Sequence, residues 1–274
     1  MLPDDFQFSQ ASLQDYADCP RRFYLRYLRR VTWPAVEAEP VLSHERHMQR
    51  ALDFHRMVHQ HLLGVSETQL TAQAGEGDLR AWWDSYLDAR PADVEGDHFP
   101  ELTLSAPLAG LRLIAQYDLV VLAPDGRTLI FDWKTSRRRT SRRWLTERLQ
   151  TRVYRYLLVQ AGGHLREGEI DPASVTMIYW FANFPHDPER LPYDAAQYTA
   201  DETVLRQMIA EIRARSHEDE FALTDDEKRC RYCLYRSLCD RGQEAGDVED
   251  LDAAEPERGG AFDLDFEQVA EVEF

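Results

Sequence analysis

The sequence contains few lysines and no long apolar segment. Of its 32 basic residues, only Lys134 and Lys228 are lysines, and the others are arginines. No stretch approaches about 18 consecutive apolar residues, and the N-terminus lacks the basic-then-apolar pattern of a signal peptide. We find no internal repeat. These absences argue against secreted, membrane-spanning and repeat proteins, and we expect a cytoplasmic chain with no membrane partner.

The acidic residues are unevenly distributed along the chain. The net charge of −17 at first sight argues against a nucleic-acid partner. Residues 244–274, however, contain 12 Asp and Glu and one Arg, so the rest of the chain has 31 basic against 37 acidic residues. We therefore expect a single domain over residues 1–243, followed by an acidic, disordered tail over residues 244–274.

The four cysteines form a cluster of three and a distant fourth. Cys230, Cys233 and Cys239 lie close together in the sequence, whereas Cys19 precedes them by some 210 residues. In a cytosolic chain such cysteines are more often ligands than disulfides. Their arrangement predicts that the two ends of the chain meet, and four thiolates suit either zinc or an iron–sulfur cluster.

Hydrophobic periodicity predicts a chain of mixed helices and strands. Ser9 is a candidate N-cap, and Cys19 is expected to end the first short helix before Pro20. The other expected elements are helices over 43–63, 78–89, 144–161 and about 200–216, strands over 99–106 and 175–182, and loops over 64–77 and 184–198.

The chain is organised around a predicted β-hairpin. Residues 113–122 and 128–134 read as strands joined by a turn at Asp125-Gly126. Side chains alternate along a strand, so Asp132 and Lys134 share one face and Trp133 points to the other. Asp118, expected near the middle of the first strand, can lie next to Asp132 by antiparallel pairing. Two carboxylates and a lysine would then share one metal-ion site, although a strand-end salt bridge is the simpler alternative.

Lysine at this position departs from the preference of the chain for arginine. Arg carries a planar fork of donors, whereas Lys carries a compact charge, which suits a single phosphoryl oxygen or a metal-bound water. The segment that follows holds five arginines in seven residues and reads as a basic loop that attracts phosphate. These candidate nucleic-acid-binding residues are Arg137, Arg138, Arg139, Arg142 and Arg143.

Two helices carry further candidate residues. In the helix over 144–161, Gln150 and Tyr154 are four residues apart and share a face. In the helix over 43–63, His55 and His59 share a face, but the segment lacks the glutamate of a zinc-protease motif. From the residues alone, both histidines are more readily interpreted as core or surface residues than as ligands.

Taken together, these motifs resemble the PD-(D/E)XK nuclease superfamily, in its RecB-like branch with an iron–sulfur cluster, such as AddB-type nuclease domains and CRISPR-adaptation exonucleases. The resemblance covers roughly residues 6–240. It rests on Ser9-x3-Leu13-x2-Tyr16-x2-Cys19-Pro-Arg-Arg-Phe23, Ala51-Leu-Asp-Phe-His55, Asp118, Asp132-Trp-Lys134, Gln150-x3-Tyr154 and the four cysteines. Ala51 departs from the glycine usual in the second motif, and the acidic tail is not part of the pattern.

The resemblance implies a fold and a site. The fold would be α/β, with a restriction-endonuclease-like core of a central mixed sheet flanked by helices, a helical N-terminal element and an iron–sulfur C-terminal element. The implied metal ligands for Mg²⁺ or Mn²⁺ are His55, Asp118, Asp132 and the backbone carbonyl of Trp133. The implied catalytic residues are Asp118, Asp132, Lys134, Gln150 and Tyr154. The implied ligands of a [4Fe-4S] cluster are Cys19, Cys230, Cys233 and Cys239, with zinc as the less favoured occupant.

The function implied by the resemblance is a metal-dependent deoxyribonuclease. We expect an exonuclease on single-stranded DNA that acts in DNA repair, recombination or CRISPR adaptation. The alternative is a nuclease fold without turnover, serving as a DNA-binding or assembly subunit beside a helicase or a CRISPR integrase. The intact set of Asp118, Asp132, Lys134 and Gln150 favours the enzyme over the silent subunit.

Overall fold

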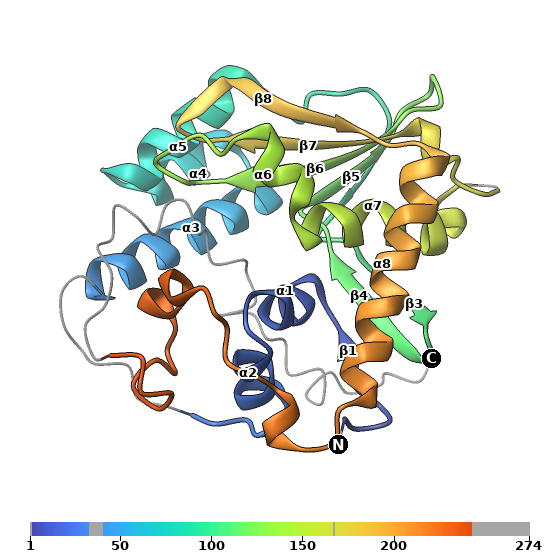
Figure 1. Cartoon of the computed structure of the whole chain (residues 1–274). Coiled ribbons are helices and arrows are strands. Elements are labelled where there is room, and N and C mark those ends of the chain that lie inside the picture. The colour runs from blue at the N-terminus through green and yellow to red at the C-terminus, as the bar shows by residue number, and fades with distance from the viewer. Residues whose placement is uncertain (1, 33–40, 167, 243–274) are drawn as a thin grey trace, which may run out of the picture.

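The computed structural model describes residues 2–32, 41–166 and 168–242 (Figure 1). The acidic tail lies outside these residues. The helices are α1 (Gln10–Asp18), α2 (Pro20–Phe23), α3 (Val41–Leu62), α4 (Glu67–Ala74), α5 (Asp78–Ala89), α6 (Arg142–Glu147), α7 (Leu149–Ala161) and α8 (Ala195–Ala214), with a π-helical turn at Tyr24–Leu28. The strands are β1 (Gln7–Phe8), β2 (Asp97–Pro100), β3 (Thr103–Leu108), β4 (Leu111–Gln116), β5 (Leu119–Leu122), β6 (Thr128–Lys134), β7 (Val175–Phe181) and β8 (Phe184–Pro192).

A five-stranded mixed sheet forms the centre of the molecule. Its strand order is β2-β5-β6-β7-β8, and neighbouring strands are antiparallel except for the parallel pair β6 and β7. Parallel strands cannot be joined by a tight turn, and the connection from β6 to β7 contains α6 and α7. The architecture is the expected α/β core, a mixed sheet flanked by helices.

Each face of this sheet is covered by a different set of helices. Phe131 and Trp133 of β6 belong to one buried apolar cluster, together with residues of α3, α4 and α5. Ile130 belongs to a second cluster, on the side of α7 and α8. Alternation along β6 therefore places Asp132 and Lys134 on the α7 side and Trp133 on the other, as the sequence predicts.

The second, three-stranded sheet continues from the first through a bent hairpin. Pro100 pairs with Leu119 in the large sheet, and Thr103 pairs with Gln116 in the small one, in the same antiparallel register. Backbone hydrogen bonds from Glu101 to Asp118 and from Tyr117 to Leu102 bridge the bend. The strands expected over 99–106 and 113–122 are thus each divided in two. The prediction of two uninterrupted strands was wrong because the apolar pattern runs on through the bend.

Three other expectations need correction. The predicted loop over 64–77 contains α4, which Ser66 caps by accepting a hydrogen bond from the Gln69 amide. The predicted loop over 184–198 contains β8, an edge strand, where proline is tolerated because one side of the backbone needs no partner. The helix expected over 144–161 is broken at Arg148, whose backbone is extended.

The two ends of the described chain lie side by side, as the cysteine spacing predicts. The Arg21 side chain donates a hydrogen bond to the carbonyl of Phe221 (2.8 Å), and the Tyr235 hydroxyl donates to the carbonyl of Val31 (3.1 Å). Figure 1 shows α1 and α2 next to the C-terminal segment. Within the described residues, no helix is both long and apolar enough to span a bilayer.

Candidate active site and cysteine pocket

The bend in the hairpin positions the first carboxylate. Asp118 lies in the break between β4 and β5, and not in mid-strand as expected, but the pairing of Leu119 with Phe131 still places it opposite Asp132. Its Oδ2 accepts a hydrogen bond from the backbone N–H of Trp133 (2.7 Å). Because the N–H and C=O of one strand residue point to the same side, we expect the Trp133 carbonyl to face the same gap.

A glutamine connects the second carboxylate to the lysine. The Nε2 of Gln150 donates to Asp132 Oδ1 (2.8 Å), and its Oε1 accepts from Lys134 Nζ (3.2 Å). The same lysine lies 2.9 Å from Asp132 Oδ2. Gln150 is the second residue of α7, so the start of that helix is fixed against the end of β6. The structure thus brings Gln150, a site residue implied by the family resemblance, together with Asp132 and Lys134, whose shared face the strand alternation predicts.

His55 approaches the site from the other helical layer. It lies on α3, and its Nδ1 is 3.3 Å from Asp118 Oδ2. Among the described residues, neither this nitrogen nor Asp132 Oδ2 has a hydrogen-bond partner of good geometry, although both atoms are buried. Each atom makes an ion-pair contact instead, His55 Nδ1 with Asp118 and Asp132 Oδ2 with Lys134, and a carboxylate oxygen and an imidazole nitrogen are both suited to bind a metal ion.

The two aspartates destabilise each other in their charged forms. Burial, followed by the nearby charges of Asp132 and Glu101, raises the pKa of Asp118 well above its ordinary value. Burial also raises the pKa of Asp132, and this increase is partly offset by Lys134 and Gln150. Each side chain is at most 4% exposed, so little solvent screens the repulsion. A bound cation would remove this penalty.

A third carboxylate, Glu101, is the site residue that sequence reasoning missed. It lies on the bend directly opposite Asp118, and its backbone N–H donates to the Asp118 carbonyl (3.0 Å). Its φ of +51° is unusual for a glutamate, which indicates a backbone that the fold constrains. Burial raises the pKa of Glu101 to about 7, and Gln116 donates to its Oε2 (2.9 Å). The antiparallel register that is common to both halves of the hairpin places Glu101 opposite Asp118, and the one available signal was an acidic residue within an otherwise apolar strand.

Tyr154 lies behind the site. Its side chain is 2% exposed, and its ring packs against Tyr117 with ring centroids 4.8 Å apart. The Tyr117 hydroxyl donates to the Tyr154 carbonyl (2.9 Å). These contacts join α7 to Tyr117, the residue that precedes Asp118 in the break between β4 and β5. A direct role in catalysis stays a prediction.

The basic segment after Lys134 is largely neutralised by carboxylates. Arg139 pairs with Asp187 (2.6 Å) and Glu189 (3.1 Å), Arg142 also pairs with Glu189, and Arg143 pairs with Glu147 (3.0 Å). Arg142 and Arg143 form the first turn of α6 and do not lie in the expected loop.

The two remaining arginines of this segment, Arg137 and Arg138, are both exposed. Arg138 has contacts of its own, whereas Arg137 makes no polar contact with the described part of the chain. Phosphate binding by all five arginines therefore stays a prediction, and binding by Arg139, Arg142 and Arg143 would compete with these ion pairs.

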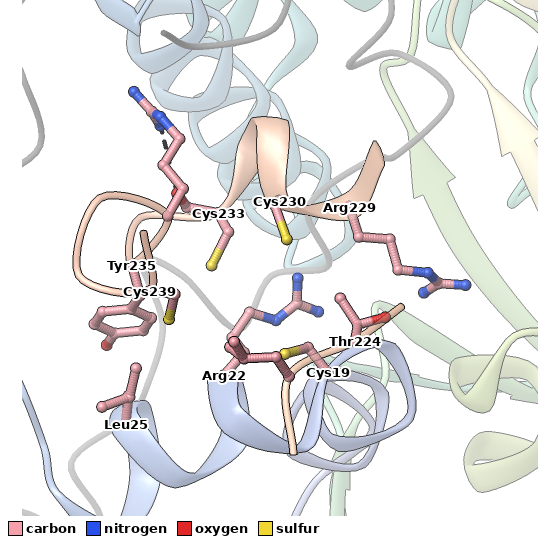
Figure 2. A pocket seen from close by; sticks show the side chains of 11 residues that line it. Cys19, Arg22, Leu25, Thr224, Arg229, Cys230, Cys233, Tyr235 and Cys239 are labelled. Carbon is pink, nitrogen blue, oxygen red and sulfur yellow. Dashed lines mark hydrogen bonds between the residues drawn. The ribbon is translucent and has the colours of Figure 1, made fainter. Parts of the chain in front are cut away.

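All four cysteines line one pocket (Figure 2). Cys19 ends α1, Cys230 lies in the 3₁₀ segment Glu227–Tyr232, and Cys233 and Cys239 follow it. The thiols are free, and Arg22 and Arg229 line the pocket beside them. The structure thus brings together the four residues that the sequence separates by some 210 positions.

The thiols share an environment that opposes ionisation. Burial raises the pKa of Cys230 and that of Cys233, and it raises the pKa of Cys239 to about 11. Repulsion among the thiolates raises all three further, whereas Arg22 lowers the pKa of Cys233. Cys230, Cys233 and Cys239 therefore resist ionisation, and they become favourable ligands once a cation compensates their charge.

Neither site is arranged for metal in its present side-chain conformation. Within the described ranges, no three His, Cys, Asp or Glu side chains form a ready-made metal site. The chemistry of the donors fits all the same: carboxylate oxygens and an imidazole suit Mg²⁺ or Mn²⁺, and thiols suit zinc or iron. The two buried atoms without hydrogen bonds, His55 Nδ1 and Asp132 Oδ2, support the first of these fits.

Residues 7–240 match the PD-(D/E)XK nuclease superfamily. The chain belongs to this family. The central sheet is accordingly a restriction-endonuclease-like core. Asp118, Asp132 and Lys134 lie at the end of its β5–β6 hairpin.

Two solved structures are similar to this chain at 11% sequence identity. One is SSO0001, with a TM-score of 0.41 over 87% of this chain and 88% of that one. The other is a proposed exonuclease from Eubacterium rectale, with a TM-score of 0.45 over 75% of this chain and 79% of that one. No curated protein matches the sequence.

Proposed function

We propose that the protein is a metal-dependent deoxyribonuclease whose active site is formed by Asp118, Asp132, Lys134 and Gln150. The observation that carries this proposal is the pair of buried carboxylates at the end of the β5–β6 hairpin, with the lysine 2.9 Å from one of them. Both carboxyls have raised pKa values, so ionising them costs free energy when no cation is bound. Membership in a nuclease superfamily gives this arrangement its chemistry.

The residues divide the work of phosphodiester hydrolysis. His55, Asp118, Asp132 and the Trp133 carbonyl would hold Mg²⁺ or Mn²⁺, which acidifies a bound water and neutralises charge on the scissile phosphate. Lys134 orients the attacking water and stabilises negative charge that develops in the transition state. Gln150 fixes the positions of the Lys134 and Asp132 side chains relative to each other through its two hydrogen bonds.

Glu101 provides a third carboxylate for the same site. It faces Asp118 across the bend and contributes to the raised pKa of that residue. A carboxylate whose charge acts on Asp118 also favours cation binding at the site, even when it makes no direct bond to the cation. We place Glu101 among the residues that set metal affinity, and we assign no proton transfer to it.

The substrate is single-stranded DNA, and the cut is exonucleolytic. This finer assignment rests on the RecB-like motifs, which include the N-terminal Cys-Pro-Arg-Arg-Phe segment and the Gln150-x3-Tyr154 helix. Repair, recombination and CRISPR adaptation are the processes in which such enzymes act, beside helicase or integrase partners. Exposed Arg137, next to the active site in the sequence, is positioned to attract the phosphate backbone.

The cysteine pocket holds a [4Fe-4S] cluster in this proposal, with zinc as the alternative occupant. Its function is structural, because Cys19 follows α1 while the other three ligands belong to the C-terminal segment. A purified iron–sulfur protein is brown, and a zinc protein is colourless. Iron, sulfide and zinc content per chain, measured after anaerobic purification, decides between the two occupants.

The activity is tested on three labelled substrates with EDTA, Mg²⁺ or Mn²⁺. Linear single-stranded DNA carries the label at the 5′ or the 3′ end, and a circular single strand provides the third substrate. We expect metal-dependent release of short products from the linear strands and no cleavage of the circle. Cleavage of the circle would show endonuclease action. A folded, metal-replete protein that cuts none of the three would support the silent-subunit alternative.

A further inference from the structure

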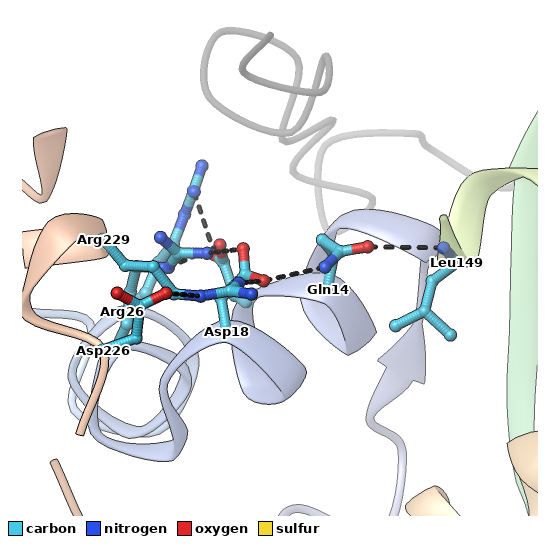
Figure 3. A network of polar contacts seen from close by, with 8 residues as sticks. Gln14, Asp18, Arg26, Leu149, Asp226 and Arg229 are labelled. Carbon is cyan, nitrogen blue, oxygen red and sulfur yellow. Dashed lines mark hydrogen bonds and ion pairs between the residues drawn. The ribbon is translucent and has the colours of Figure 1, made fainter. Parts of the chain in front are cut away.

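Helix α7 begins without a side-chain cap of its own. Arg148 occupies the N-cap position, but its side chain makes no capping hydrogen bond. The first backbone N–H of the helix, that of Leu149, donates instead to the Oε1 of Gln14 on α1 (3.3 Å; Figure 3). An unpaired N–H at a helix start costs stability, so Gln14 provides the missing acceptor from a distant part of the chain.

The other end of the Gln14 amide binds Asp18. Its Nε2 donates to Asp18 Oδ1 (2.9 Å), and Asp18 in turn pairs with Arg22 (2.8 Å) and with Arg229. Figure 3 shows these contacts as one continuous network. Both oxygens of Asp18 therefore have charged or amide donors, and its side chain is only 14% exposed.

This network leads directly to the cysteine pocket. Asp18 precedes Cys19 in the chain, and Arg229 precedes Cys230. Arg22 and Arg229 both line the pocket, and the Arg22 charge lowers the pKa of Cys233. The same two arginines thus face the thiols on one side and Asp18 on the other.

We propose that Gln14 is a positioning residue that links the cysteine pocket to the nuclease site. Gln14 fixes Leu149, and the next residue, Gln150, holds both Asp132 and Lys134. The position of Gln14 is set by Asp18, and that of Asp18 by the two arginines of the pocket. The catalytic part of this inference rests on the proposed nuclease function; the structural link does not.

The network differs from general packing because it acts on one helix terminus. A displacement of the first turn of α7 moves the Gln150 amide relative to two partners at 2.8 and 3.2 Å. Hydrogen bonds weaken steeply with distance and angle, so a small displacement misaligns Lys134. We expect the turnover rate to fall while DNA binding, which relies on other residues, is retained.

Two substitutions and a control separate the link from simple stabilisation. Gln14→Met removes both amide contacts at similar length, and Gln14→Glu keeps an acceptor for the Leu149 N–H. Gln207→Met, on an exposed position of α8, is the matched control. Each protein is assayed for kcat and KM on end-labelled single-stranded DNA. Hydrogen–deuterium exchange of the peptide that covers Leu149 provides a readout without activity.

For Gln14→Met, we expect kcat to fall roughly five- to tenfold with KM within about twofold, and exchange at the Leu149 peptide to rise. Gln14→Glu, which keeps the acceptor for Leu149 but loses the donor to Asp18 and repels it, should lose less kcat than Gln14→Met, and Gln207→Met should match the wild type in both measurements. Asp18→Asn, which touches neither Leu149 nor Gln150, should also raise exchange at Leu149. It tests the half of the network nearer to the cysteines.

Failure of this inference is distinguishable from failure of the proposed function. An active wild type with unchanged kcat and exchange in Gln14→Met overturns the link and leaves the nuclease intact. An inactive wild type whose Leu149 exchange still rises in Gln14→Met overturns the nuclease and leaves the link. Equal kcat losses in Gln14→Met and Gln14→Glu, without a change in exchange, would also contradict the link. If Gln14→Met fails to fold, Asp18→Asn provides the same exchange measurement.

Discussion

The carboxamide of Gln150 bridges Asp132 and Lys134, donating to the carboxylate at 2.8 Å and accepting from the ammonium at 3.2 Å. A carboxamide can do both, because its nitrogen donates and its oxygen accepts, and both atoms are bonded to one carbon. The bridge ties α7 to β6, which lies in the central sheet. The two charged residues are therefore held by a neutral residue that neither competes for metal nor adds charge.

The bridge predicts an asymmetry between two substitutions of Gln150. Gln150→Glu retains an acceptor for Lys134 but places a carboxylate against Asp132, whose pKa is already raised by burial. We expect Gln150→Ala to lose roughly tenfold in kcat and Gln150→Glu to lose more. Kinetics at saturating Mn²⁺ measure both variants. A Gln150→Glu enzyme as active as the wild type would show that the bridge is dispensable.

Replacing Glu101 by Gln should stabilise the protein, and the gain should depend on pH. Burial raises its pKa from 4.5 to about 7, so the folded state favours the protonated form. The free energy of unfolding therefore falls as pH rises from about 4.5 to about 7, and the full penalty persists above that range. Glu101→Gln should melt above the wild type at pH 8 in EDTA and near it at pH 5.

The same variant should bind Mn²⁺ more weakly, because it has lost one of three nearby negative charges. The increase in melting temperature caused by Mn²⁺ should then be smaller than in the wild type. Differential scanning fluorimetry with and without Mn²⁺ measures this effect. A difference in melting temperature between Glu101→Gln and the wild type that is equal at pH 5 and pH 8 would contradict the assigned pKa.

Loss of a cysteine predicts loss of stability together with loss of the bound cofactor. Cys233→Ala removes one of the four proposed ligands, which line one pocket between the N-terminal helices and the C-terminal segment. We expect a lower melting temperature by circular dichroism and less metal per chain, since metal binding contributes to folding free energy. An unchanged melt would exclude the structural role of the pocket. Leu234→Ala, at an exposed position next to Cys233, is the control for the substitution itself.

Substitutions of Arg137 and Arg143 should change the salt dependence of DNA binding by different amounts. Arg137 is exposed and free of polar contacts with the described residues, whereas Arg143 pairs with Glu147 at 3.0 Å. Each phosphate that the protein neutralises contributes roughly 0.7 to the slope of log Kd against log salt for single strands. Arg137→Ala should reduce this slope by about that amount and Arg143→Ala by less. Titrations by fluorescence anisotropy at several salt concentrations measure the difference, and equal slopes would contradict it.

Local patterns predicted the elements that local rules control. Ser9 forms a reciprocal capping box with Ser12, and Cys19 ends α1, as the cap and proline signals indicate. The β5–β6 hairpin, β7 and α5 follow from turn residues and periodicity. Strand alternation predicted that Asp132 and Lys134 share a face, whereas Gln150 was a candidate site residue only through the family resemblance; the structure places its amide within hydrogen-bond distance of both.

The sequence did not predict features that depend on tertiary context. The bend at Glu101 and Asp118 leaves no mark in the apolar pattern, since β3, β4 and β5, which flank it, all carry buried apolar residues. Strand β8 carries three prolines that an internal strand would not tolerate, and only its edge position permits them. The pairing of Arg139 and Arg142 with Glu189 joins segments nearly 50 residues apart, which composition cannot show.

The most direct test of the proposed active site compares substitutions of the two lysines of the chain. Lys134→Met and Lys228→Met each remove one ammonium group, but only Lys134 lies beside Asp132. Single-turnover cleavage of end-labelled single-stranded DNA with Mn²⁺ is measured for both variants and the wild type. If Lys134 belongs to the active site, Lys134→Met cleaves about 10²- to 10³-fold more slowly than the wild type, and Lys228→Met cleaves at the wild-type rate. Equal activity of Lys134→Met and the wild type would contradict the assignment of the hairpin as the active site.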